Sequence, residues 1–340
     1  LKENINCTHK TSPPEGSESI YTRRVPLGVI FHIAAGNTDI LPAYSLIEGL
    51  LCGNINILKL PQADNGITVM LMKMLTDELP ELKGYIHVFD TPSSDVPAMI
   101  KMAGLCDAIS VTGGDSAVSA VRQMAPAGVQ LIEWGHKLSF CYISPQPASG
   151  SPEHFEKWLS VHTEDLSGLA EHIMSTRQFL CSSCQVIYIN TDDPGYLHSF
   201  CRVFLPFLEN AASFHPVSDI GAAAENTLRN RCRKIESVIE KNSSSGRSVY
   251  EGANCSLTVC EDSVLELSDL WGSCLVKRLP EEQMMEVLRS RKGYLQTAGL
   301  IADGDRQELT ELLIRCGISR VLPPAQMSYT FAGESHDGMY

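Results

Sequence analysis

Residues 29–61 read VIFHIAAGNTDILPAYSLIEGLLCGNINILKLP, and this stretch decides the fold class. Strand candidates at residues 25–33 and 54–60 flank a helix candidate at residues 41–51. Both strand candidates are short and rich in Ile, Leu and Val, as buried parallel strands are. A strand, a helix and a second strand in this order predict the beginning of a parallel α/β sheet.

The same alternation continues outward as far as about residue 133. Further strand candidates are residues 85–89, 107–111 and 129–132, and further helix candidates are residues 67–79, 96–103 and 117–124. The first of these helices has an apolar face at helical spacing, formed by Ile67, Leu71, Met74 and Leu75. The pattern predicts a doubly wound α/β sheet, which binds ligands beyond the carboxyl ends of its strands.

A second α/β region begins near Lys137, and a polar lead-in segment precedes the first region at residues 1–24. The second region contains helix candidates at 153–173, 195–208 and 221–241 and a strand candidate at 185–190. Its last helix has an apolar stripe of Leu228, Cys232, Ile235 and Ile239. We expect two domains, residues 1–135 and 136–321, with residues 322–340 as a candidate for return to the first domain.

Composition and charge exclude several classes of protein. Hydrophobic residues make up 44% and charged residues 20% of the 340-residue chain, as in an ordinary globular protein. No apolar run reaches the roughly 18 residues of a membrane span, and a formal net charge of -13 argues against a general nucleic-acid binder. Some of the 12 cysteines (Cys52, Cys106 and Cys141) lie in apolar runs as small hydrophobes, which fits a cytoplasmic protein.

Four segments contain the residues that suggest chemistry. They are PLGVIFHIAAGN at 26–37 with GNINILKLP at 53–61, SVTGGD at 110–115, LIEWGHK at 131–137, and QFLCSSCQVIYI at 178–189. In this order they resemble the aldehyde dehydrogenase superfamily, and most of all the LuxC-like acyl-CoA reductases. The resemblance extends over residues 25–340 and includes His336-Asp337-Gly338 near the end of the chain. It implies an α/β, aldehyde-dehydrogenase-like fold with a cofactor-binding domain and a catalytic domain.

The resemblance implies that Cys181 is the covalent nucleophile, which must react as a thiolate. Cys184 forms a CxxC with it, and this spacing leaves a regulatory disulfide or a zinc site open. A zinc site needs about four ligands, and the sequence has no second CxxC or HxxxH, so we expect no metal. We expect Cys184 to enter the following strand with its sulfur in the packing.

Asn37 and Glu133 complete the catalytic residues that the resemblance implies. Asn37 would stabilise the oxyanion together with the main-chain N–H of Cys181, a contribution often worth about 3 kcal/mol. An Asn at this position is also a common cap for the next helix. Glu133 matches the general base of the superfamily, although a carboxylate that merely ends a strand fits too. The family's ELGG is here Glu-Trp-Gly-His.

The resemblance also implies the cofactor site. Lys59 would bond the adenosine ribose, and Thr112, Gly113 and Gly114 would lie near the pyrophosphate, where a helix N-terminus attracts phosphate. Many NAD-preferring members carry a glutamate where this chain has Gln62. We therefore expect NADPH to bind at least as tightly as NADH.

A further segment, Asp269-Leu270-Trp271-Gly272, resembles the family's EIFGP. By this likeness Asp269 would contact the nicotinamide ribose, with a shorter reach than the usual glutamate. A cationic run precedes it, formed by Arg229, Arg231, Arg233 and Lys234. These cations either bind the phosphates of coenzyme A or form the solvated face of a helix.

Together these residues imply an acyl-CoA reductase that forms an aldehyde through a Cys181 acyl-enzyme, with coenzyme A as the leaving group and NADPH or NADH as hydride donor. The alternatives are a hydrolytic aldehyde dehydrogenase and a non-catalytic homologue in an acyl-transfer complex. We expect a homo-oligomer, with Cys181 and the turn at residues 112–115 facing one cleft. The segment before Pro26 is short for the family, so part of the cofactor domain is expected to be missing.

Overall fold

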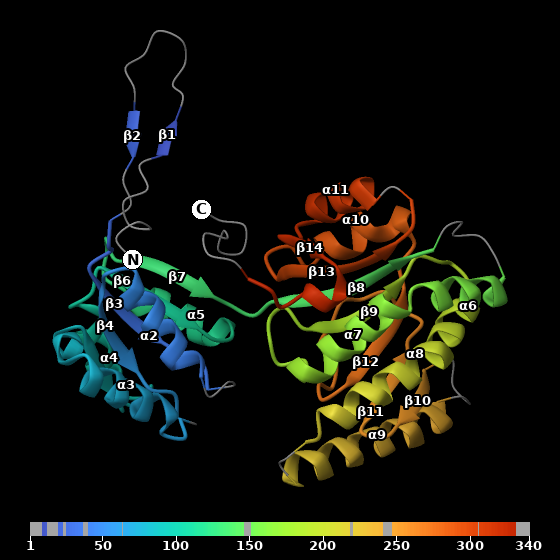
Figure 1. Ribbon diagram of the computed structural model, residues 1–340, viewed down its shortest axis with the longest axis horizontal. Coiled ribbons are helices and arrows are strands. Elements are labelled where there is room, and N and C mark those ends of the chain that lie inside the picture. The colour runs from blue at the N-terminus through green and yellow to red at the C-terminus, as the bar shows by residue number, and fades with distance from the viewer. Residues whose placement is uncertain are drawn as a thin grey trace. The chain divides into compact units, whose positions relative to one another are not determined.

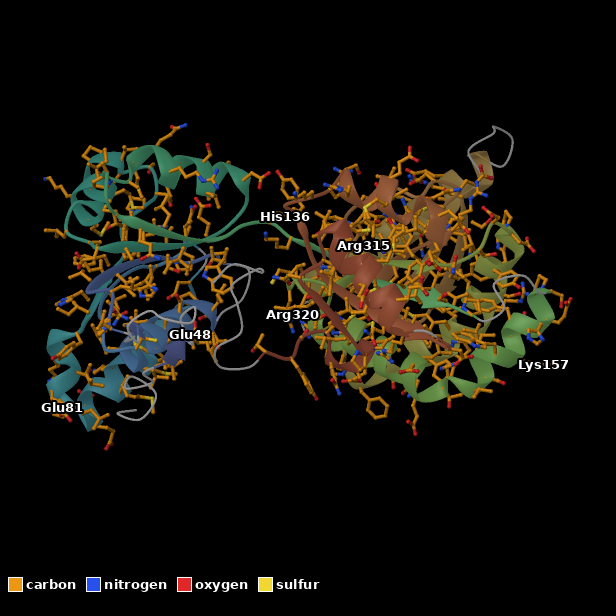
Figure 2. All side chains as sticks on the ribbon, turned by 90° about the horizontal axis from the view of Figure 1, so that it is seen from above. Glu48, Glu81, His136, Lys157, Arg315 and Arg320 are labelled. Atoms are coloured by element: carbon orange, nitrogen blue, oxygen red, sulfur yellow. The ribbon has the colours of Figure 1, made fainter. Side chains whose placement is uncertain are left out.

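The computed structural model describes residues 9–11, 20–22, 25–36, 40–62, 64–145, 151–217, 220–240, 247–304 and 306–330. The chain divides into two compact units, Leu1–His136 and Lys137–Tyr340. It passes from the first unit to the second at His136 (Figure 2). Each unit has its own hydrophobic clusters.

The first unit is built on a five-stranded parallel sheet. In spatial order its strands are β5 (Ile86–Phe89), β4 (Ile55–Lys59), β3 (Val29–Ile33), β6 (Ala108–Thr112) and β7 (Gln130–Trp134). The chain winds outward from β3 through β4 to β5, then returns to the other side of β3 to form β6 and β7. The doubly wound sheet is therefore confirmed, and its order reverses between β3 and β6.

Helices cover both faces of this sheet. They are α2 (Leu41–Leu51), α3 (Ile67–Glu78), α4 (Val96–Ala103) and α5 (Asp115–Met124), with the short 3-10 helix η1 (Pro80–Gly84) before β5. Buried side chains of α2 and α3 form one cluster with β4, whereas those of α4 and α5 form a second cluster on the opposite face. Asp95 caps α4 by accepting a hydrogen bond from the Ala98 N–H at 3.1 Å.

The lead-in segment is more regular than its polar composition predicts. The strands β1 (His9–Thr11) and β2 (Ile20–Thr22) pair antiparallel within residues 1–24. Their Lys, Tyr and Thr residues give no apolar alternation over the three residues of each strand, so periodicity could not indicate them.

The second unit is built on a seven-stranded sheet. In spatial order its strands are β10 (Ser248–Gly252), β11 (Cys255–Val259), β12 (Ser273–Arg278), β9 (Cys184–Ile189), β8 (Leu138–Ser144), β13 (Leu295–Ala302) and β14 (Arg320–Leu322). Only β10 pairs antiparallel with its neighbour, and all other pairs are parallel.

Helices also cover both faces of the second sheet (Figure 1). On one face lie α6 (Pro152–Val161), α7 (Thr163–Thr176) and α8 (Pro194–Phe214), and on the other lie α10 (Glu281–Arg289) and α11 (Arg306–Cys316). The short 3-10 helix η2 (Pro324–Gln326) packs on α7 and β13, within the second unit. Residues 331–340 lie outside the described residues.

The single helix expected at residues 153–173 is wrong, because His162 separates α6 from α7. The φ and ψ of His162 are -95° and 33°, outside the helical region. Its imidazole lies between two carboxylates, 3.3 Å from Asp165 Oδ2 and 3.2 Å from Asp303 Oδ1. One of these contacts is with a residue far along the chain, so apolar periodicity could not reveal the break.

The long helix α9 (Ile220–Glu240) forms near the expected residues, but Leu228, Cys232 and Ile235 of the expected apolar stripe are exposed. Leu228 is 64% and Ile235 60% exposed, whereas Asn230 is buried and accepts hydrogen bonds from Ser256 and Ser273. The stripe therefore does not mark the face that packs on the sheet. Among the described residues no helix is long and apolar enough to cross a membrane.

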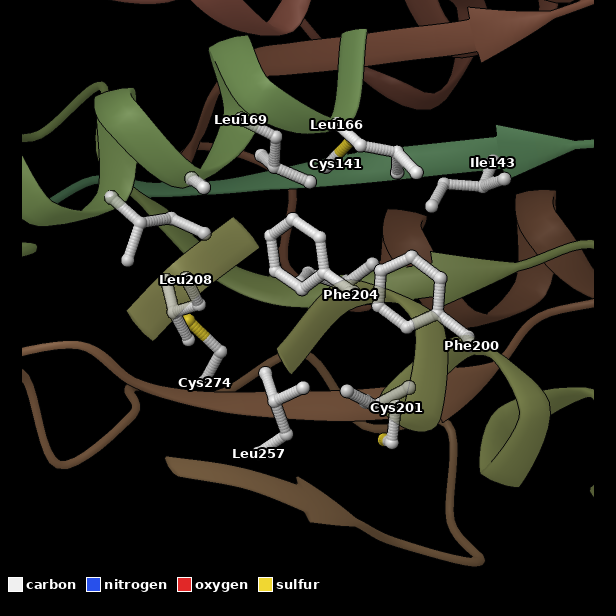
Figure 3. Close-up of a cluster of buried hydrophobic side chains, with 14 of the residues drawn as sticks. Cys141, Ile143, Leu166, Leu169, Phe200, Cys201, Phe204, Leu208, Leu257 and Cys274 are labelled. Atoms are coloured by element: carbon white, nitrogen blue, oxygen red, sulfur yellow. The ribbon is translucent and has the colours of Figure 1, made fainter. Parts of the chain in front are cut away.

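Cysteines take part in the core of the second unit. Figure 3 shows Cys141, Cys201 and Cys274 among Leu and Phe side chains, including Phe204. Each fully buried Phe contributes about 1.5–3 kcal/mol to folding. Cys106 and Cys141 are buried as expected, but Cys52 is exposed at the end of α2, so its expected burial is wrong.

Candidate active site

Cys181 lies in a tight loop between α7 and β9, which we call the nucleophile loop (residues 177–183). The loop leaves α7 through Arg177 and Gln178, whose φ angles are 49° and 64°. Non-glycine residues rarely adopt this left-handed region, and they do so where surrounding contacts hold them. A turn then closes the loop, with Ser183 N–H donating to Leu180 O at 3.0 Å.

The two cysteines of the CxxC have opposite environments. The Cys181 side chain is exposed, whereas Cys184 is the first residue of β9 and is fully buried. Burial raises the pKa of the Cys184 thiol to about 12, so this sulfur stays protonated near neutral pH. The expected packing of Cys184 is thus confirmed. Among the described residues no group of His, Cys, Asp and Glu side chains could hold a metal ion.

Ser139 at the beginning of β8 holds the main chain of Cys181. Its Oγ donates to Cys181 O at 2.6 Å and accepts from Thr297 N–H at 3.1 Å. No described residue accepts a hydrogen bond from the Cys181 main-chain N–H. The Cys181 carbonyl is therefore held in place, whereas the Cys181 N–H bonds to none of the described residues.

His172 of α7 also helps to hold the nucleophile loop in place. Its Nε2 accepts from Cys184 N–H at 3.3 Å, and its Nδ1 lies 3.4 Å from Ser328 Oγ. Ser328 Oγ in turn lies 3.1 Å from Ser182 Oγ. Burial lowers the pKa of His172 to about 4, so the ring is neutral at physiological pH and Nε2 stays an acceptor.

Asp269 lies in a second strained loop, residues 268–272. Leu270, Trp271 and Gly272 have φ angles of 66°, 54° and 82°. Glycine suits position 272 because its φ of 82° lies in the left-handed region, and a Cβ there would also lie 2.6 Å from Met174 Sδ. The Asp269 carboxylate forms an ion pair with Arg233 of α9.

The cationic run on α9 is therefore only partly a solvated face. Arg229 pairs with Glu225 and Lys234 with Glu251 at the surface, whereas Arg233 turns inward to Asp269. The role expected for Asp269 at a nicotinamide ribose stays a prediction. Arg233 is a contact of this acid that the sequence analysis did not identify.

Cys181, Asp269 and Ser139 lie at the amino ends of neighbouring parallel strands. The nucleophile loop precedes β9, the 268–272 loop precedes β12, and Ser139 and Thr297 lie near the beginnings of β8 and β13. Ser139 and His172 belong to no recognisable motif, so the sequence did not predict them. Their only signal is a polar side chain in an otherwise apolar strand or helix.

In the first unit, the predicted cofactor residues lie at the carboxyl ends of the strands. Lys59 is the last residue of β4 and is buried, and its Nζ donates to Ser93 Oγ at 2.9 Å. Burial lowers the pKa of Lys59, against the opposing effect of Asp90. Lys59 is therefore not a simple surface lysine.

Thr112 ends β6, and Gly113 and Gly114 lead into α5. The Gly113 N–H already donates to Trp134 O at 3.1 Å, so a phosphate would meet the amides that follow it. A Cβ added at Gly114 would meet no atom within 4 Å, so this side of the main chain is open to a ligand. Asp115 in the first turn is an acid that competes for the positive end of the helix.

Glu133 lies on β7 and forms two hydrogen bonds with Arg122 of α5. Both of its carboxylate oxygens accept from the guanidinium, each at 2.5 Å. Glu133 raises the pKa of Arg122 through these bonds. A general base would have to leave this pairing. Asn37 and the terminal His336-Asp337-Gly338 lie outside the described residues.

Known proteins resemble this chain in sequence. Over 182 residues the chain is 26% identical to the long-chain acyl-protein thioester reductase of Vibrio harveyi, a match that covers 53% of this chain and 35% of that one. The corresponding protein of Aliivibrio fischeri is 24% identical over 182 residues, which cover 52% and 35% of the two chains. The aligned part thus spans about a third of these relatives.

Solved structures resemble it in fold. An NAD-dependent benzaldehyde dehydrogenase from Corynebacterium glutamicum matches with a TM-score of 0.62 at 14% identity, over 94% of this chain and 69% of that one. A glyceraldehyde-3-phosphate dehydrogenase from Methanocaldococcus jannaschii, complexed with NADP, matches with a TM-score of 0.61 at 14% identity, over 95% and 70%. The aldehyde-dehydrogenase-like α/β fold is thereby confirmed.

The family itself follows from a match over nearly the whole sequence. Residues 7–340 match the family described as acyl-CoA reductase (LuxC). This range includes the nucleophile loop, the 268–272 loop and the sheet of the first unit. The chain therefore belongs to the LuxC family of acyl-CoA reductases.

Proposed function

We propose that this protein reduces an acyl thioester to an aldehyde through a covalent Cys181 acyl-enzyme. The observation that carries the proposal is an exposed Cys181 thiol on a strained loop whose carbonyl is fixed by Ser139. A reactive cysteine must be both accessible and held in place, and the buried Cys184 meets only the second condition.

In the first half of the reaction the Cys181 thiolate attacks the acyl carbon. A new carbon–sulfur bond forms, the bond to the sulfur of coenzyme A breaks, and the departing thiolate takes up a proton. The Cys181 main-chain N–H has no acceptor among the described residues, which supports a role as oxyanion donor, with the Asn37 amide proposed as the second donor. One such donor is commonly worth about 3 kcal/mol.

A reduced nicotinamide cofactor, when bound, would supply the hydride for the second half. Gly114 and the first turn of α5 would hold it, because they follow β6 at the point where strand order reverses, and Lys59 would join them from the carboxyl end of β4. Gln62 is exposed just after β4 and brings no negative charge, which supports NADPH binding at least as tightly as NADH. The Cys181 sulfur then leaves as a thiolate, and the aldehyde is released.

A hydrolytic aldehyde dehydrogenase is the less favoured function. It needs a general base that activates water, and Glu133 is the expected residue. Both oxygens of Glu133 are bonded to Arg122, which does not favour this role. A reductase has no need of that base at the acyl-enzyme, because water there would destroy the intermediate.

Mass spectrometry of the intact protein tests the proposal directly. The protein is incubated with a panel of acyl-CoAs of different chain length, without cofactor. We expect a mass increase equal to the acyl group, and loss of that mass with aldehyde release once NADPH is added. Release of the free acid instead would favour the hydrolytic enzyme, and no adduct with any acyl-CoA would overturn covalent catalysis from coenzyme A thioesters.

A further inference from the structure

A buried amide joins the two strained loops of the second unit. Gln178 belongs to the nucleophile loop and is 1% exposed. Its Nε2 donates to Cys184 O at 2.9 Å, and its Oε1 accepts from Gly272 N–H at 3.0 Å. One side chain therefore bonds the beginning of β9 on one side and the 268–272 loop on the other.

A second glutamine closes the connection. Gln185 is 3% exposed, and its Nε2 donates to the main-chain O of Gln178 at 2.8 Å. Its Oε1 accepts from Ser268 N–H at 3.2 Å and from Ser268 Oγ at 2.7 Å. Asp269 thus follows one anchored residue, Ser268, and precedes another, Gly272.

We infer that Gln178 is a positioning residue that couples the nucleophile loop to the 268–272 loop. A change at Cys181 is transmitted to the loop of Asp269 through the amide of Gln178, although Gln178 needs no contact with substrate. The left-handed residues of both loops keep their conformation only while their contacts hold them. Loosening one loop therefore removes a restraint on the other.

Trp271 reports on this coupling. Its ring packs edge-on against Phe179, with 4.9 Å between centroids, and the Arg177 guanidinium lies 5.4 Å from its centroid. The Trp271 N–H of the main chain donates to Arg177 O at 3.1 Å. An indole between the two loops changes its fluorescence when either loop moves.

The test treats the protein with iodoacetamide, peptide mass spectrometry identifies each labelled cysteine, and Cys181→Ser gives the response to labelling at the other exposed thiols, such as Cys52 and Cys232. The Cys181 thiol reacts with iodoacetamide whether or not the protein reduces acyl thioesters, so the outcome does not depend on the proposed function. Only the importance of the coupling for catalysis rests on that function. In the parent, we expect labelling to change the Trp271 emission and the hydrogen exchange of residues 268–272. The emission change should disappear in Trp271→Phe.

The variant Gln178→Met removes both hydrogen bonds at similar side-chain length. We expect labelled Gln178→Met to lose most of the change in residues 268–272, and its acyl transfer from acyl-CoA to fall about 100-fold, as a small misplacement of a nucleophile can cause. The matched control is Asn190→Leu, which removes a buried amide at the opposite end of β9. The control should keep the coupled response.

If Gln178→Met does not fold, Gln185→Met tests the same connection from the other side. Labelling of the parent that leaves both Trp271 and residues 268–272 unchanged would overturn the inference. It would equally be overturned by Gln178→Met retaining the full response, or by Asn190→Leu losing it. A parent that shows the response but forms no acyl adduct would contradict the proposed function and leave the coupling in place.

Discussion

The two units place their predicted sites at opposite ends of their sheets. In the first unit Lys59, Thr112 and Gly113 lie where parallel strands end. In the second unit Cys181 and Asp269 precede the strands β9 and β12. The first site follows the general rule for open α/β sheets, and the second does not.

The difference lies in what holds each site. At the carboxyl ends, the backbone does most of the positioning, because strand order and a helix N-terminus create the site. At the amino ends, the loops are held by buried side chains, including Ser139, His172 and Gln178. We therefore expect the substitution of a single buried side chain to disturb the geometry of the second site more than that of the first.

The largest expected effect comes from the two cysteines. Cys181→Ser should abolish the acyl adduct, because a serine hydroxyl without a dedicated base is a poor nucleophile. Cys184→Ser should keep the adduct and lose stability, since it buries a hydroxyl in an apolar site. Intact-protein mass spectrometry after incubation with acyl-CoA distinguishes them, and the reverse result would move the nucleophile to Cys184.

Acid should weaken the second site through His172. The pKa of this residue in the fold is about 4, below its ordinary 6.5, so the unfolded chain takes up a proton first as pH falls. The free energy of unfolding is therefore unaffected by His172 above pH 6.5 and falls by about 1.4 kcal/mol per pH unit between 6.5 and 4. The total loss is roughly 3 kcal/mol.

His172→Gln should remove this part of the acid dependence, because a glutamine oxygen can accept from Cys184 N–H without titrating. Urea denaturation of parent and variant at a series of pH values measures the difference. Hydrogen exchange should locate it in residues 177–184 and leave β3 and β4 of the first unit unchanged. Equal acid sensitivity in both proteins would show that His172 does not titrate as argued.

Substitutions at the two ends of β8 compare a position at the second site with a position away from it. Ser139→Ala removes the hydrogen bond to Cys181 O and leaves the buried Thr297 N–H without its acceptor, which costs about 1–3 kcal/mol. We expect acylation to slow by about tenfold or more, with cofactor affinity unchanged. Ser144→Ala is the matched control, because it removes a buried hydroxyl at the carboxyl end of β8. Equal losses in both variants would contradict a special role for Ser139.

The sequence predicted the first unit more completely than the second. Helices at 41–51 and 96–103 match the structure, because short apolar strands, prolines in first turns and an Asp cap are local signals. The break at His162 and the buried polar face of α9 depend on contacts with distant residues such as Asp303 and Ser256. Such contacts produce no periodic pattern in the sequence.

The site residues also divide into those that the sequence predicted and those that depend on distant contacts. Family resemblance indicated Cys181, and the structure separates it from Cys184 by exposure. The Glu133 pairing with Arg122, eleven residues away on α5, could not be expected, because the resemblance implied a base and periodicity indicates only a strand. Ser139 and Gln178 act through hydrogen bonds to residues 42 and 94 positions away, which no local pattern predicts.

The smallest expected effect tests the first site alone. Lys59→Met keeps most of the buried apolar volume and removes the ammonium at the carboxyl end of β4. NADPH affinity should fall about tenfold, the equivalent of about 1.4 kcal/mol, as measured by fluorescence titration. Acylation of Cys181 without cofactor should stay within about twofold of the parent, because Lys59 has no part in the proposed attack on the acyl carbon. Lys101→Met, at an exposed lysine near the end of α4, is the control and should change neither quantity. Loss of acylation in Lys59→Met would mean that the lysine stabilises more than a cofactor site, and unchanged NADPH affinity would remove Lys59 from that site.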